Sequence, residues 1–166
     1  MSLENLNQMT EAEATHAFMQ CCTSETWVAK MVAKRPFASA ESCKNAANEL
    51  WKNLAEEDYL QAFDGHPKIG DVNSLRAKYA NTKELASGEQ SAVNHADEQV
   101  LADLAKGNDD YDSKFGFIFI VCATGKSAEE MLALLQARLP NDRATELVNA
   151  AEEQRKIFHI RLEKLL

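Results

Sequence analysis

Helix-start signals recur along this 166-residue chain, each followed by apolar residues at helical spacing. Thr10 and Ser127 each precede a glutamate by three residues. This is the pattern of a capping box, in which a hydroxyl and a carboxylate satisfy free backbone N–H groups. After Ser39, apolar residues return every three or four positions, which places them along one side of a helix. They are Cys43, Ala47, Leu50, Trp51 and Leu54. Because the chain has only 6 Gly and 3 Pro, a turn-rich all-β fold is disfavoured.

The pattern predicts an all-α fold, a single-domain bundle of about seven or eight helices spanning residues 1–166. The predicted helices cover residues 10–19, 24–35, 39–55, 57–63, 87–106, 127–139 and 141–166, with helical pattern also at 74–76. Gly107 and Asn108 are predicted to end the long helix 87–106 as a left-handed cap, and Asn141 to cap the last helix. Residues 64–71 are predicted to form an ordered loop. The apolar run 115–123 has no evident strand partner, so we expect a buried, mostly helical or irregular segment.

Charge and composition exclude several function classes. The chain carries 18 basic and 26 acidic residues, a net charge of −8, which disfavours general binding to nucleic acid or to anionic membrane surfaces. No apolar stretch approaches the ~18–20 residues that span a bilayer. The N-terminus lacks the features of a secretory signal, so a cytoplasmic protein is expected. The four cysteines form no C-x-x-C pair and are expected to be reduced thiols, with no metal site.

His66 is the first candidate for chemistry. It stands between Gly65 and Pro67, outside any predicted helix, and the proline restricts His66 to extended backbone geometry. A stiffened backbone suits a positioned acid–base group, and imidazole titrates nearest to physiological pH. The alternative is a histidine that only bridges the loop.

Two further candidates come from other segments. Ser87 can cap a helix, with Glu89 and Gln90 in its first turn. Alternatively, Glu89 orients the His66 imidazole and Gln90 binds an amide-rich substrate. Arg161 either favours the end of the last helix by its charge or binds a planar anion or carbonyl edge through two N–H groups.

Taken together, these segments resemble the OHCU decarboxylase family. The resemblance rests on GHPKIGD at 65–71, ASGEQ at 86–90, KFGFIFIVCA at 114–123 and EEQRKIFHIRL at 152–162, in this order. OHCU is 2-oxo-4-hydroxy-4-carboxy-5-ureidoimidazoline, an intermediate of uric acid degradation. The family often has Ser three residues before its Glu, whereas this chain has Ala86 there and Ser87 one position later.

The resemblance implies a cofactor-free, all-α carboxy-lyase, usually a homodimer, which releases CO₂ from OHCU and forms (S)-allantoin. It implies that His66 and Glu89 are catalytic. From the chemistry we further hypothesise that His66 is the proton donor and that Glu89 orients it. It implies substrate contacts by Pro67, Gln90, Ile118, Phe119, Ile120, Val121, Cys122 and Arg161, those of 118–122 through backbone groups. Ser87, one position after the family's serine, is expected to be a further substrate contact.

Two other functions remain compatible with these residues. One is a non-catalytic helical interaction module, in which His66 is structural and the apolar runs form a dimer face. The other is a different cofactor-free enzyme that acts on a related ureide without releasing CO₂.

Overall fold

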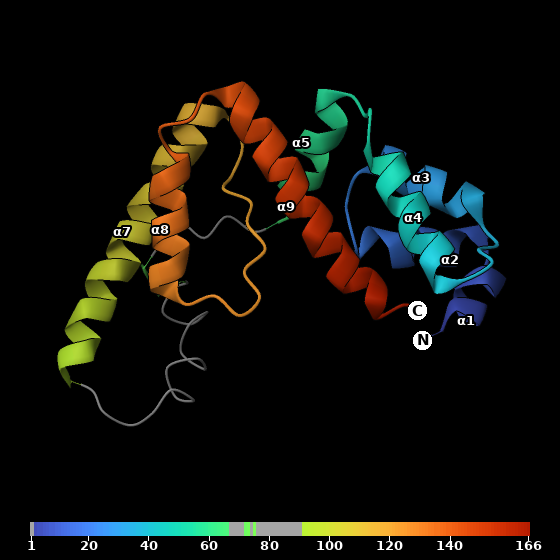
Figure 1. Ribbon diagram of the computed structural model, residues 1–166, viewed down its shortest axis with the longest axis horizontal. Coiled ribbons are helices and arrows are strands. Elements are labelled where there is room, and N and C mark those ends of the chain that lie inside the picture. The colour runs from blue at the N-terminus through green and yellow to red at the C-terminus, as the bar shows by residue number, and fades with distance from the viewer. Residues whose placement is uncertain (1, 67–71, 74, 76–90) are drawn as a thin grey trace. The chain divides into compact units, whose positions relative to one another are not determined.

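The computed structural model describes residues 2–66, 72, 73, 75 and 91–166, without the side chains of 91–97. Its described part is helical, with no strand among these residues, which confirms the predicted all-α class (Figure 1). The helices are α1 (Leu3–Gln8), α2 (Glu11–Met19), α3 (Glu25–Lys34), α4 (Ala40–Trp51), α5 (Glu56–Asp64), α7 (Ser91–Phe115), α8 (Ala128–Arg138) and α9 (Arg143–Glu163). No helix in the described ranges has both the length and the apolarity to cross a membrane.

The capping boxes predicted at Thr10 and Ser127 are present. Thr10 Oγ1 accepts from the backbone N–H of Glu13 at 3.1 Å, and the Glu13 carboxylate accepts from the Thr10 N–H at 3.0 Å. Ser127 and Glu130 form the same reciprocal pair at the start of α8. Helix α1, capped by Ser2, was not predicted, because six residues are too few to show a periodic apolar pattern.

Several predicted helix boundaries are wrong. The helix predicted over 39–55 ends at Trp51, and the last helix ends at Glu163 rather than at residue 166. Gly107 and Asn108 do not end a helix, since α7 continues to Phe115. A Cβ on Gly107 would lie 2.5 Å from Leu135 Cδ2, so this glycine serves the close approach of α7 and α8, which run side by side (Figure 1). The last helix is capped by Asp142 rather than Asn141, because Asp142 Oδ1 accepts from the Thr145 N–H at 2.7 Å.

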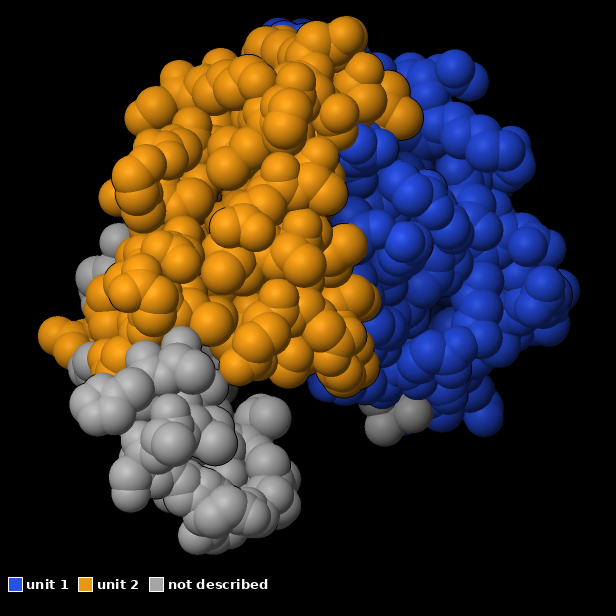
Figure 2. All heavy atoms as spheres, turned by 60° about the vertical axis from the view of Figure 1, so that its left-hand side comes forward, with its two compact units in different colours: residues 1–66, 120–122, 149–166 blue, residues 67–119, 123–148 orange. Residues whose placement is uncertain are grey.

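The described residues divide into two compact units (Figure 2). Of the described residues, unit 1 contains those within 1–66, 120–122 and 149–166, and unit 2 contains those within 67–119 and 123–148. The prediction that 1–166 forms one domain stays a prediction.

The core of unit 1 is built around Phe158 of α9. Its ring stacks on Trp27 of α3, with centroids 4.9 Å apart, and meets the edge of Trp51 of α4 at 5.5 Å. Trp27 Nε1 donates to the Ala47 carbonyl at 3.1 Å, and Trp51 Nε1 donates to the Ala151 carbonyl at 3.0 Å. These contacts satisfy both buried indole N–H groups and fix the later part of α9 against α3 and α4.

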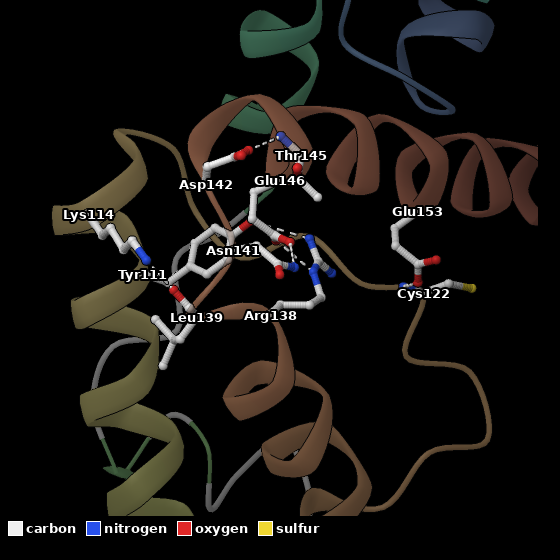
Figure 3. Close-up of polar contacts among 10 residues, drawn as sticks. All are labelled: Tyr111, Lys114, Cys122, Arg138, Leu139, Asn141, Asp142, Thr145, Glu146 and Glu153. Carbon is white, nitrogen blue, oxygen red and sulfur yellow. Dashed lines mark hydrogen bonds and ion pairs between the residues drawn. The ribbon is translucent and has the colours of Figure 1, made fainter.

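The core of unit 2 contains a buried polar network on Glu146 (Figure 3). Glu146 has no exposed surface and accepts from Tyr111 Oη at 2.5 Å, Arg138 Nε at 2.7 Å and Asn141 Nδ2 at 2.8 Å. The Arg138 guanidinium also lies 4.6 Å from the centre of the Phe119 ring. Burial, more than any neighbour, raises the pKa of Tyr111, so this phenol stays protonated and donates to the carboxylate.

The run 115–123 is irregular beyond Phe115, as one of the two predicted options allowed. Phe117, Phe119 and Ile120 are buried without forming a helix. Gly116 has φ +81°, a left-handed conformation that breaks the helix directly after α7.

Candidate active site

The backbone around His66 is fixed by the end of α5. The N–H of His66 donates to the Phe63 carbonyl at 3.1 Å, and that of Gly65 donates to the Ala62 carbonyl at 3.2 Å. A Cβ on Gly65 would lie 2.1 Å from Oγ1 of Thr23, whose hydroxyl is within bonding distance of the Gln61 and Ala62 carbonyls. Gly65 is therefore required by a close approach and not by a special φ, which is −72°.

We expect Gly65→Ala to lower the free energy of unfolding by about 1–3 kcal/mol, the usual cost of overpacking. The added methyl group collides with Thr23 and displaces the chain next to His66. Urea denaturation measures this loss. Thr23→Ala is the control, because it removes the two nearest colliding atoms. The double variant should be less destabilised than the sum of the single variants, and strict additivity would contradict the close approach.

The His66 imidazole is half-buried and held by one side chain of α9. Its Nε2 lies 2.6 Å from Oε1 of Gln154. Burial lowers the pKa of His66, and the Arg161 charge lowers it further, whereas the hydrogen bond to Gln154 raises it. The His66 imidazole therefore stays neutral down to a lower pH than the imidazole of an exposed histidine.

Arg161 lies on the same side of α9 as Gln154, because seven residues make nearly two helical turns. Its Nη1 is 3.4 Å from the Cys21 carbonyl oxygen and 3.5 Å from that of Gln20, both long for hydrogen bonds. Burial raises the pKa of the Cys21 thiol to about 12 despite this neighbouring cation, so Cys21 stays a thiol. The Arg161 guanidinium therefore lies near enough to the His66 imidazole for its charge to lower the pKa of that ring.

The segment 120–122 belongs to the same unit as these two side chains. The N–H of Cys122 donates to Oε1 of Glu153 at 2.9 Å (Figure 3). The second carboxylate oxygen of Glu153 accepts from Lys156 Nζ at 2.6 Å. Glu153 thus holds the irregular chain at Cys122 against α9.

Part of the predicted site lies within one compact unit. His66, Ile120, Val121, Cys122 and Arg161 belong to unit 1, whereas Ile118 and Phe119 belong to unit 2, where Phe119 is a core residue. Pro67, Ser87, Glu89 and Gln90 lie outside the described residues.

Gln154 and Glu153 are not among the predicted site residues. The signal in the sequence is weak: Gln154 precedes Arg161 by seven residues and so shares a helix face with it. Only the tertiary structure shows that this glutamine is buried and contacts His66.

Comparison with known proteins decides the family. The sequence pattern of the family described as OHCU decarboxylase matches residues 7–163. The chain belongs to the OHCU decarboxylase family. A crystal structure described as OHCU decarboxylase in the presence of (S)-allantoin has 33% sequence identity and a TM-score of 0.69, covering 89% of this chain and 95% of that one.

Curated relatives within the family differ in length. An Arabidopsis thaliana protein, "Uric acid degradation bifunctional protein TTL", is 35% identical over 145 residues, which are 87% of this chain and 45% of that protein. A Bacillus sp. (strain TB-90) protein, "Uric acid degradation bifunctional protein", is 30% identical over an alignment of 172 positions, which covers 99% of this chain and 32% of that one. The chain therefore spans less than half of these two relatives. It aligns with 92% of a Halalkalicoccus jeotgali protein named 2-oxo-4-hydroxy-4-carboxy-5-ureidoimidazoline decarboxylase, at 25% identity over 99% of this chain.

Proposed function

We propose that this protein decarboxylates OHCU to (S)-allantoin and CO₂ in urate degradation. The observation that carries the proposal is the held, half-buried His66 imidazole in the electrostatic neighbourhood of Arg161, in a chain of the OHCU decarboxylase family. Support also comes from the likeness to the structure obtained with (S)-allantoin, which covers nearly all of that chain.

The chemistry suits residues of this kind. The carboxylate of OHCU is bonded to a carbon next to a C=N bond. When the C–C bond breaks and CO₂ leaves, the electron pair moves into that C=N bond and the nitrogen takes up a proton. The resulting enol becomes a carbonyl when its hydroxyl gives up its proton and the ureido-bearing carbon takes a proton on one face. The substrate thus provides its own electron sink, and the enzyme has to orient the carboxylate and direct that last proton.

We assign these tasks to the candidate residues. His66 delivers the proton to one face of the ureido-bearing carbon, which makes the product a single enantiomer. Arg161 binds an anionic or carbonyl edge of the substrate, and backbone groups of 120–122 bind ring or ureido amides. Glu89 is a further catalytic residue and Gln90 binds amides, as the resemblance to the family implies, while Pro67, Ser87, Ile118 and Phe119 line the substrate.

The test is to generate OHCU from urate enzymatically and to follow it by circular dichroism with and without this protein. Accelerated formation of (S)-allantoin, with release of one CO₂ per substrate, is the expected result. A spontaneous rate and a racemic product would contradict the proposal. They would leave an interaction module, or an enzyme for another ureide, as the function to test next.

Replacing Arg161 by Met should lower kcat/KM for OHCU by about 10- to 100-fold, because a hydrogen-bonded charge pair with the substrate is lost. Arg155→Met is the matched control, since Arg155 lies on the same helix but pairs with Glu152 at the surface. Steady-state kinetics of both variants checks the effect. Equal kcat/KM for Arg161→Met and the unmodified protein would show that Arg161 does not bind the substrate.

The assembly proposed from the family resemblance is a homodimer. Light scattering coupled to gel filtration should give twice the 18.5 kDa chain mass. A monomeric mass with full activity would contradict it.

A further inference from the structure

Gln154 is an unusual residue among the buried side chains. The buried polar residues of the described chain are Ser24, Glu146 and Gln154. Ser24 caps α3, and Glu146 accepts hydrogen bonds from Tyr111, Arg138 and Asn141. Gln154 has no exposed surface, and its Nε2 has no hydrogen-bond partner within the described part of the chain. A buried amide N–H group without a hydrogen-bond partner lowers the stability of the fold, so the presence of Gln154 calls for a specific role.

The position of the Gln154 amide is fixed by its helix. Phe158, four residues later on α9, is fully buried and stacks on Trp27. Trp51 donates to the carbonyl of Ala151, one turn before Gln154. Contacts on both sides along α9 therefore hold the glutamine in place, and its Oε1 meets His66 Nε2 at 2.6 Å.

We propose that Gln154 is a positioning residue for His66: its carbonyl holds the Nε2–H, so that the proton passed to substrate travels through Nδ1. The inference rests on the proposed role of His66 as proton donor. An amide oxygen only accepts, so it binds Nε2–H in both the neutral imidazole and the imidazolium. The ring therefore keeps one orientation while the proton on Nδ1 comes and goes.

A neutral partner suits this task better than a carboxylate. A carboxylate would stabilise the imidazolium strongly and hold the proton on the ring. The amide raises the pKa of His66 only in part, because burial and the Arg161 charge act in the opposite direction. The glutamine thus fixes geometry and leaves the imidazole able to release its proton.

The tautomer of His66 is the direct test on the unmodified protein. Imidazole ¹⁵N shifts and two-bond couplings distinguish Nε2–H from Nδ1–H, and His66→Asn identifies the resonances among the four histidines. We expect the Nε2–H tautomer at a pH where His66 is neutral. A predominant Nδ1–H tautomer would overturn the proposal.

Two variants test the functional consequence. Gln154→Met fills a similar volume without an acceptor and should lower kcat about 10- to 100-fold, the cost of a misplaced group, with KM changed less than about threefold. Gln154→Glu keeps an acceptor but adds charge, and should move the alkaline limb of the kcat profile to higher pH because it raises the pKa of His66. If Gln154→Met does not fold, the profile of Gln154→Glu decides, and an unmoved limb counts against the proposal.

Asn48 offers a matched control. Its Oδ1 lies 2.6 Å from Nε2 of His159, the same contact on another histidine of unit 1. Asn48→Leu should leave kcat and the pH profile unchanged. If His66→Asn abolishes activity while Gln154→Met retains full kcat, the proposed role of Gln154 is contradicted and the proposed role of His66 as proton donor is supported. If His66→Asn is itself fully active, the proposed function of His66 fails instead.

Discussion

Replacing His66 by Asn is expected to reduce the enzymatic rate of OHCU decarboxylation by about 10²–10⁴-fold, the usual contribution of a positioned proton donor. Asparagine retains a polar side chain but cannot supply a proton at neutral pH. The remaining reaction should lose its stereochemical preference, because no group delivers the proton to one face. Circular dichroism of the allantoin formed measures rate and handedness together.

His159→Asn is the matched control for this prediction. His159 is also half-buried in unit 1, and its Nε2 contacts an amide oxygen at the same 2.6 Å. Burial lowers the pKa of His159 as it does that of His66. If both variants keep the far-ultraviolet spectrum of the unmodified protein and lose activity equally, His66 has no special role in the reaction.

Replacing Glu146 by Ala is expected to lower the free energy of unfolding by about 3–5 kcal/mol, the range for breaking a buried ion pair. Glu146 is fully buried, and the Arg138 side chain paired with it is only 12% exposed. Without the carboxylate, the guanidinium stays in a poorly solvated position, and the hydroxyl of Tyr111 and the amide of Asn141 lose their acceptor. Denaturation in urea, followed by circular dichroism, measures the loss.

Glu152→Ala is the control for this stability effect. Glu152 lies on the same helix and pairs with Arg155 at the surface, where an ion pair contributes about 0–1 kcal/mol. Tyr111→Phe should fall between the two, because it removes one donor and keeps the buried ring. A Glu146→Ala protein as stable as Glu152→Ala would show that the network does not stabilise unit 2.

Much of the helical content could be predicted from short-range patterns. The capping boxes at Thr10 and Ser127 act within three residues, so the sequence displays both partners. Gly107 shows the limit of this reasoning: a glycine that often ends a helix lies inside α7 because Leu135 of another helix packs against it. The cap of α9 was misplaced by one residue, since Asn141 and Asp142 are both good caps and the Asn141 amide binds Glu146 instead.

For the candidate site, the sequence by itself determined the residue types and the family. His66 in its Gly-His-Pro context and Arg161 on the last helix can be recognised because motif and spacing are local properties of the chain. Only the tertiary structure decided what holds the imidazole. Gln154 is 88 residues away along the chain and makes its contact only because aromatic packing seats α9 against α3 and α4. A hydrogen bond between such distant residues depends on the packing of whole helices, and no pattern within a few residues encodes it.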